Sequence, residues 1–236
     1  MDAFLLKQVV SELSGALPGA LVSKVHQPAD REIVLALWTG HGEKRLLLSA
    51  DPENCRIHLT TRRSPNPAVP PRFCQYLRRH MEGMRVASLA LAPYDRSVRI
   101  DFASSRPDAE HERTSLYAEL FGRHANLIYV DEAGTILCPL RVVSPEESRI
   151  REVSPGLPYR PLPRPARVFL PEVTPEDAER IFAGGFGGLD RALQGSVAGL
   201  GREAAREAKE AESSCRTAIS SSLERAASSW ASSDSM

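Results

Sequence analysis

Two glycines near the C-terminal end of the sequence have the spacing of a phosphate-binding turn. Gly199 and Gly201 flank Leu200 within an otherwise small and apolar segment, 197–205. This pattern favours a tight turn between two helices that leaves backbone N–H groups open to a phosphate oxygen. It predicts a helix-hairpin-helix turn, and it is equally typical of a helix–helix turn with no ligand.

An arginine-rich stretch upstream has the chemistry of a phosphate-binding surface. Residues 56–99 hold nine arginines against two acidic residues, although 30 Lys and Arg balance 30 Asp and Glu over the whole chain. Segregated charge creates a local positive field, and guanidinium groups bind phosphate bidentately. Each arginine alone is better explained as solvated surface, but together they favour a binding surface. The group consists of Arg62, Arg63, Arg72, Arg78, Arg79 and Arg85.

The dipeptide Asp95-Arg96 falls in a loop between two predicted strands. A carboxylate beside a guanidinium can read a base edge and a phosphate together. The same dipeptide is also common as an Asx turn with an exposed arginine. Spacing alone favours the turn.

A second polar motif spans residues 119–126. Gly122 ends a predicted strand there and lets Arg123 and His124 project. Glu119 and His124 are residue types that suit acid–base work, but no nucleophile accompanies them. We therefore predict a binding protein that is not an enzyme, with no catalytic residue, metal site or cofactor.

Hydrophobic periodicity predicts an α+β chain of antiparallel β-sheets with packed helices. The last helix of the first domain has Phe73, Cys74, Leu77 and Met81 on one face and Arg72, Gln75 and Arg79 on another. Leu189, Leu193 and Val197 form a further helical stripe. The predicted helices are 2–16 and 71–82, and the predicted strands are 21–27, 32–38, 45–49, 56–60, 97–102, 114–121, 126–131 and 135–140.

Composition sets the remaining boundaries. Six prolines between residues 154 and 171 are typical of a linker, and ten serines among the last 24 residues are typical of a frayed tail. Four scattered cysteines and the absence of an export signal or apolar span favour a reducing cytoplasm and no membrane. The expected domains are 1–160, a linker at 161–171, the hairpin module and possible start of a coiled coil at 172–212, and a tail at 213–236.

These motifs, in this order, resemble the N-terminal NFACT domain of the RqcH/NEMF/FbpA ribosome quality-control family. The resemblance covers most of residues 4–160, and the segment 172–206 resembles the family's next domain. It is carried by the segments 23–28, 45–49, 56–60, 70–80, 95–96, 119–126 and 141–142.

The resemblance implies a formamidopyrimidine-glycosylase-like N-terminal fold followed by the helix-hairpin-helix module. It also implies binding of tRNA, typically alanyl-tRNA, and of a stalled large ribosomal subunit that carries peptidyl-tRNA, in support of template-free alanine tailing. Asp95 and Arg96 resemble the tRNA-contacting pair, and Glu119 and Arg123 fall in a second tRNA-facing motif. Secondary phosphate contacts are expected from Arg62, Arg63, Arg72, Arg79, Gly199 and Gly201. Such proteins continue into a coiled coil and a C-terminal RNA-binding domain, so this chain is expected to be a truncated form.

Two other functions are open at this point. A glycosylase-like enzyme is one, although the sequence begins Met1-Asp2-Ala3 and lacks the N-terminal proline and glutamate of those enzymes. A fibronectin-binding adhesin is the other, and the lack of an export signal argues against it.

Overall fold

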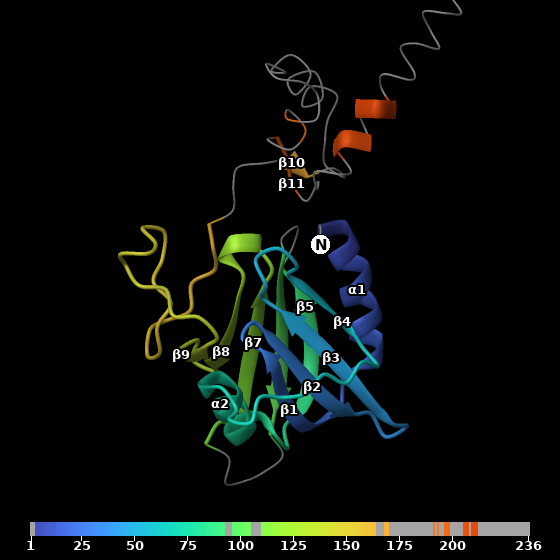
Figure 1. Cartoon of the computed structure of the whole chain (residues 1–236), viewed down its shortest axis with the longest axis vertical. Helices are drawn as coiled ribbons and strands as arrows, with labels where there is room; N and C mark the ends of the chain where they lie inside the picture. Colours follow the sequence, from blue (N-terminus) through green and yellow to red (C-terminus); the bar gives the residue numbers. More distant parts are fainter. Residues whose placement is uncertain are drawn as a thin grey trace, which may run out of the picture. The chain divides into compact units, whose positions relative to one another are not determined.

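The computed structural model describes residues 3–92, 96–104, 110–163, 168–169, 191, 193, 196–198, 205–207 and 209–211. The chain divides into two units, residues 1–164 and 165–236. In the first unit, nine antiparallel strands and two helices are described (Figure 1). The class predicted from the sequence, an antiparallel sheet with a few helices, is confirmed.

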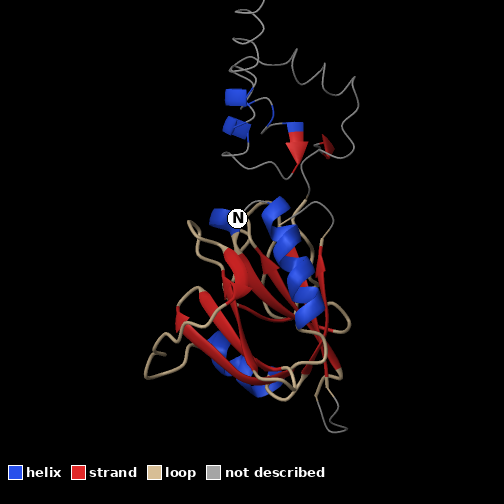
Figure 2. Cartoon of the chain, turned by 90° about the vertical axis from the view of Figure 1, so that its right-hand side faces the viewer, coloured by secondary structure: helices blue, strands red, loops and turns tan. Residues whose placement is uncertain are grey.

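The nine strands form one sheet that folds into two layers. Their order is β4-β3-β2-β1-β5-β6-β7-β8-β9. β1 and β5 share the single register pair Leu21↔Arg85, so the sheet turns a corner there (Figures 1 and 2). The strands are β1 (Leu21–Ala29), β2 (Glu32–Trp38), β3 (Glu43–Ser49), β4 (Arg56–Leu59), β5 (Arg85–Leu91), β6 (Ser97–Ala103), β7 (Arg113–Glu119), β8 (Asn126–Asp131) and β9 (Ile136–Pro139).

The main hydrophobic core lies between the β1–β4 layer and the β5–β9 layer. Alternating side chains of β3 and β6 point into it, among them Leu46, Leu48, Ile100 and Phe102, all essentially inaccessible to solvent. Helix α1 (Ala3–Ala16) adds the buried side chains of one face to the same core. Alternation in β3 and β6 therefore turns one face of these strands toward the core. In contrast, β2 and β8 are buried on both faces, and a second, smaller cluster that includes Ile128, Val130 and Ile136 packs on the other side of β8 and β9.

Helix α2 (Arg72–Met81) has the two faces that its sequence predicts. Phe73, Cys74, Leu77 and Met81 are buried, while Arg72, Gln75 and Arg79 are exposed. Pro71 makes no side-chain cap. Instead, the buried Gln27 of β1 accepts the N–H of Cys74 through Oε1 at 3.1 Å. This bond ties the start of α2 to β1.

The sequence analysis did not anticipate β5. Its register shifts between Val86 and Ser88, and this irregularity interrupts the two-residue alternation by which a strand is recognised. A second difference concerns residues 154–160, which belong to the proline-rich stretch 154–171 that is typical of a linker. They lie along the β8–β9 hairpin, where Thr135 bridges Pro158 and Tyr159 donates its N–H to the Gly134 carbonyl. That part of the linker prediction is wrong because the proline sits at a sheet edge, where its missing N–H leaves no bond unmade.

The second unit is described at few positions. Val197, expected on a helical stripe, lies in the two-residue strand β11 (Val197–Ala198), which pairs in parallel with β10 (Val168–Phe169). Gly199 and Gly201 lie outside the described residues, as does the predicted tail 213–236. The helix-hairpin-helix module therefore stays a prediction. Among the described residues, no helix is long and apolar enough to cross a membrane.

Candidate nucleic-acid interface

Two of the predicted polar motifs lie side by side at one end of the β5–β9 layer. Arg96, at the start of β6, accepts the N–H of Leu120 through its carbonyl oxygen at 2.8 Å. The Arg96 guanidinium carbon lies 5.5 Å from the centre of the Phe121 ring, a cation–π distance. Asp95 lies outside the described residues. The structure therefore brings Arg96 against the 119–124 segment, which ends in the 3₁₀ turn Gly122–His124.

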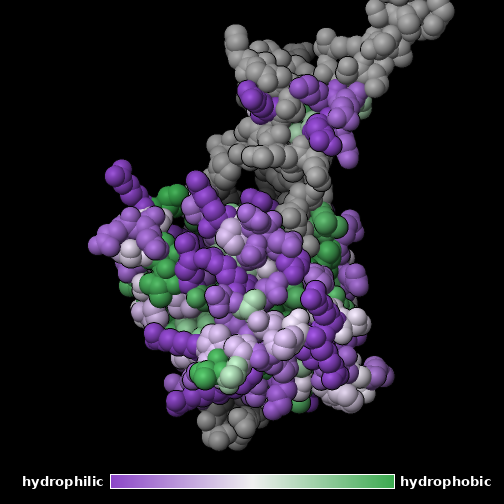
Figure 3. All heavy atoms as spheres, in the orientation of Figure 1, coloured by the Kyte–Doolittle hydropathy of each residue, from purple (hydrophilic) through white to green (hydrophobic). Residues whose placement is uncertain are grey.

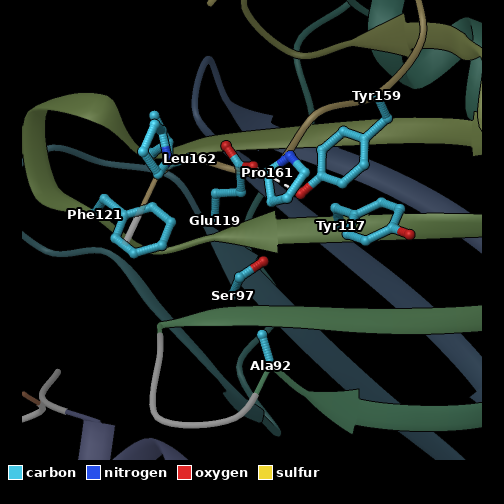
Figure 4. A pocket seen from close by; sticks show the side chains of 9 residues that line it. Ala92, Ser97, Tyr117, Glu119, Phe121, Tyr159, Pro161 and Leu162 are labelled. Carbon is cyan, nitrogen blue, oxygen red and sulfur yellow. Dashed lines mark hydrogen bonds between the residues drawn. The ribbon is translucent and has the colours of Figure 1, made fainter. Parts of the chain in front are cut away.

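Glu119 points into the protein. Its side chain is about 1 % exposed and forms an ion pair with Nη2 of Arg151, itself 8 % exposed. The other carboxylate oxygen accepts the hydroxyl of Tyr159 at 2.9 Å (Figure 4). Burial first, and the Glu119 charge second, raise the pKa of Tyr159, so the phenol stays protonated and donates. The contacts described for Glu119 are within the chain, and its contact with RNA stays a prediction.

The possible acid–base pair of Glu119 and His124 is not formed. His124 instead accepts a hydrogen bond from Nε of Arg123 at 3.0 Å, and both of these side chains are exposed. Arg123 therefore projects toward solvent, as expected from the glycine that precedes it. Gly122 has a φ of 60°, a conformation that favours glycine.

An aromatic hollow of about 590 Å³ opens on one side of Glu119. Tyr117 and Tyr159 stack at its wall with ring centroids 3.9 Å apart and an interplanar angle of 25°. Phe121 and the segment 161–163 line the rest (Figure 4). Flat aromatic walls beside arginines are the combination on which single-stranded bases stack.

A basic hollow of about 420 Å³ includes Arg151, the ion-pair partner of Glu119, in its lining. The guanidinium-bearing residues around it are Arg123, Arg141 and Arg151, against the carboxylate of Glu147. Leu162 lines both hollows. Positive charge and stacking surface therefore meet at this end of the layer, as recognition of a nucleic acid requires.

Arg141 is fixed in place by its backbone. The buried Asn126 accepts the Arg141 N–H through Oδ1 at 3.0 Å and donates from Nδ2 to the Arg141 carbonyl at 2.7 Å. Nε of Arg141 is buried and makes no hydrogen bond within the described part of the chain. Buried donors without an acceptor are rare, and this one suits an oxygen of a bound phosphate.

The remaining arginines do not converge on this end. Arg72 and Arg79 are exposed on α2. The end of α2 reaches the far end of β7, where His80 lies 3.2 Å from Glu110. Six residue steps along β7 separate Arg113 from Glu119, roughly 20 Å at about 3.4 Å per residue. The end of α2 that bears Arg79 therefore does not share one surface with Arg96 and Arg123, and the phosphate contacts expected of Arg72 and Arg79 stay predictions.

Other members of the predicted basic group have separate locations. Arg62 and Arg63 are exposed in the segment after β4, in the other layer. Arg78 donates from Nε to the Val25 carbonyl at 2.9 Å, and Arg85 donates from Nη1 to the Gly19 carbonyl at 2.8 Å. The last two guanidinium groups therefore make contacts within the fold.

Sequence reasoning missed three residues of this interface as site residues: Arg141, Arg151 and Tyr159. Arg141 occurs in one of the segments that carry the family resemblance, so that signal was present. Arg151 and Tyr159 lie 32 and 40 residues from Glu119 in the sequence, and no local pattern connects them. Within the described residues, no group of three or more His, Cys, Asp or Glu side chains is arranged to hold a metal ion.

Comparison with known proteins gives the relatives of this chain. The family model described as the NFACT N-terminal and middle domains matches residues 2–233. The Rqc2 homolog RqcH of Bacillus subtilis is 29 % identical over 208 residues, which cover 88 % of this chain and 36 % of that protein. The Rqc2 homolog RqcH of Streptococcus pneumoniae is 32 % identical over 159 residues, 67 % of this chain and 29 % of the relative. The chain thus spans about a third of the length of these curated relatives.

Solved structures show the same fold. The N-terminal domain of the fibronectin-binding protein PavA from Streptococcus pneumoniae superposes with a TM-score of 0.79 at 29 % identity, covering 92 % of this chain and 82 % of that one. The N-terminal part of the fibronectin/fibrinogen-binding protein from Streptococcus suis gives a TM-score of 0.75 at 29 % identity over 87 % of this chain and 77 % of the other. With a family model that matches nearly the whole sequence, the chain belongs to the NFACT N-terminal domain family, the family of the ribosome quality-control factors RqcH and Rqc2.

Proposed function

We propose that this chain binds tRNA on a stalled large ribosomal subunit that carries peptidyl-tRNA, and that it thereby supports template-free addition of alanine to the nascent chain. The proposal rests on one observation: Arg96, Phe121 and Arg123 lie together at one end of β6 and β7. The two hollows beside Glu119 supply stacking surface and positive charge there. The kinship with Rqc2 homologues supports the biological setting.

The proposed role is binding, with the peptide bond made by the ribosome. The basic hollow offers Arg123 and Arg141 to phosphates, and the stacked tyrosines offer a platform to a base. Glu119 and its partners hold the Arg151 segment against β7, so their role is to position the surface. The proposal places the protein in the cytoplasm, and alanyl-tRNA is the preferred ligand.

Binding of tRNA to the Arg96→Ala and Arg123→Ala variants tests this proposal. Loss of one phosphate contact should weaken binding and lower the slope of log K against log salt by about 1. Arg113→Ala is the matched control, because Arg113 is exposed at the opposite end of β7. Crosslinking with sequencing of bound RNA should recover tRNA from wild type and less from the Asp95→Ala/Arg96→Ala variant. Equal binding and equal salt slopes for all variants would remove this end of the layer from the interface.

A second candidate function is binding of fibronectin, because the solved relatives PavA and the Streptococcus suis protein carry that activity in their names. Immobilised fibronectin should retain little of this chain, and soluble tRNA should not compete for what is retained. Saturable retention that is insensitive to Arg96→Ala and Arg123→Ala would favour the adhesin instead.

A further inference from the structure

A second basic hollow, of about 290 Å³, lies on the outer face of the β1–β4 layer. The side chains of Leu46 and Leu48 point into the core from β3, so Arg45 and Leu47 point to the other face. Register places His26, Val34, Leu47 and His58 in one row across β1, β2, β3 and β4. Figure 3 shows that hydrophilic side chains dominate the face over β2 and β3. This hollow is built by four strands, independently of the interface described above.

The segment after β4 forms one wall of the hollow. Arg62 and Ser64 line it, and the Asn66 amide donates to Nδ1 of His26 at 2.9 Å. The Thr60 N–H also bonds the Arg45 carbonyl at 2.8 Å, which holds the start of the segment against β3. These bonds give the hollow a fixed shape.

The donors of the hollow outnumber its acceptors. Arg45, Arg56 and Arg62 stand against the single carboxylate of Glu32, which already accepts from Arg56 at 2.7 Å. The His26 ring, which accepts at Nδ1 from Asn66, is left with its hydrogen on Nε2 as a further donor in the neutral form. The charge of the lining is therefore positive and only partly compensated.

Arg45 is the distinctive residue of this hollow. Its side chain is 14 % exposed, its Nη1 lies 3.4 Å from the half-exposed Glu43, and its Nε is buried with no hydrogen bond within the described residues. An unpaired buried donor on a charged group is costly, and an anion in the hollow would satisfy it. A volume near the lower end of the range for small-molecule sites, about 300–1,000 Å³, suits one small anionic group.

We infer that this hollow is a phosphate-binding site in which Nε–H of Arg45 donates to a phosphate oxygen. Arg56 and Arg62 supply the balancing charge, and the neutral His26 supplies a further donor. The phosphate is either one unit of an RNA backbone or the group of a small phosphate ester, since both present the same oxygens. The site stands whether or not the Arg96 end binds tRNA.

Titration of the full chain with inorganic phosphate at constant ionic strength tests the site. The expected result is a saturable shift of the Arg45 Nε–H resonance and a saturable rise in thermal stability. Arg45→Met should abolish the rise in thermal stability, and Arg63→Met should leave both signals intact, since Arg63 is exposed and does not line the hollow. No saturable response of wild type, or an equal stability response of Arg45→Met, would overturn the inference.

Arg45→Lys keeps the charge and removes the Nε–H donor. Its affinity for phosphate should fall at least about tenfold, the equivalent of one charge-assisted hydrogen bond. Affinity equal to that of wild type would remove Nε from the site. Circular dichroism of both Arg45 variants checks that the fold is kept.

Competition identifies the source of the phosphate. Displacement by a short single-stranded RNA assigns the site to an RNA backbone, and displacement by glycerol phosphate but not by RNA assigns it to a small ester. Either result supports the site. Arg96→Ala and Arg123→Ala should leave phosphate binding unchanged, so failure of the tRNA interface and failure of this site are separable.

Discussion

The two layers of the sheet each contain a largely buried arginine, and the two arginines have opposite surroundings. Arg151, beside β7, donates to the Glu119 carboxylate and to the Arg160 carbonyl. Arg45, on β3, has one long contact to Glu43 and a buried Nε with no acceptor in the described structure. A guanidinium whose donors are used within the chain contributes to the fold. A guanidinium with a buried donor that has no acceptor within the chain indicates a ligand.

The largest effect is expected from removing the paired arginine. Arg151→Met leaves the carboxylate of Glu119 buried without its counter-ion, which should lower the free energy of unfolding by about 3–5 kcal/mol. Urea unfolding measures it. Addition of Glu119→Gln to that variant should restore part of the loss, because the stranded charge is then gone. A loss below that of an ordinary surface substitution would show that the pair is not part of the fold.

The hydroxyl of Tyr159 should contribute less. Tyr159→Phe removes one of the hydrogen bonds to Glu119 but keeps the ring stacked on Tyr117, so a loss of about 1.5 kcal/mol is expected. Tyr117→Phe is the control, since it keeps the stack and leaves the bond between Tyr159 and Glu119 in place. Equal losses in the two variants would show that the loss does not come from the hydrogen bond between Tyr159 and Glu119.

The unpaired arginine should be nearly neutral for stability. Arg45→Met removes a donor that has no acceptor and one long contact to the half-exposed Glu43. The free energy of unfolding should therefore change by less than about 1 kcal/mol in phosphate-free buffer. Urea unfolding in parallel with Arg151→Met gives a direct comparison of the two sites. A loss near that of Arg151→Met would mean that Arg45 is part of the fold.

The smallest effect is the dependence of stability on pH that His26 confers. Burial, and then the charges of Arg45 and Arg78, lower the pKa of His26 below its ordinary value of 6.5. Between the folded pKa and pH 6.5, the unfolded chain therefore binds more protons at His26 than the folded chain does. The stability that depends on a neutral His26 is thus fully present above pH 6.5 and is lost as pH falls toward the folded pKa.

His26→Asn should flatten the stability profile below pH 6.5, and the His80 contribution should remain, since burial lowers the pKa of His80 as well. Arg45→Met should bring the pKa of His26 closer to its ordinary value by removing one of the two positive charges. NMR titration of the ring resonances measures both shifts. An unchanged pKa of His26 in the Arg45→Met variant would mean that Arg45 lies too far from His26 for the two side chains to share a ligand.

Local patterns in the sequence were sufficient for most of the first unit. Alternation predicted the strands from 21 to 59 and from 97 to 139, and helical spacing predicted both faces of α2. β5 was missed because its register shift breaks the alternation. In the second unit, the prediction for Val197 failed where apolar spacing alone had to distinguish a helix from a strand.

The candidate site was predictable only in part. Gly122 and the polar residues after it were visible as a motif, and the family resemblance singled out Arg96 and Arg123. The pairing of Glu119 with Arg151 and Tyr159 depends on a segment that returns over tens of residues. Sequence spacing does not predict such a long-range contact. It also does not predict which donors of Arg45 and Arg141 have hydrogen-bond acceptors.

The return of residues 156–159 along the start of β9 also covers part of one margin of the sheet. Ile136 donates its N–H to the Leu157 carbonyl and accepts the N–H of Gly156, so its polar backbone groups are occupied. Pro158 sits opposite Thr135 with no N–H to offer. A second copy of the chain that approaches this side would therefore meet few unpaired backbone N–H groups, and the ring of Pro158 would obstruct strand pairing. The molecule is protected there against growth by strand addition.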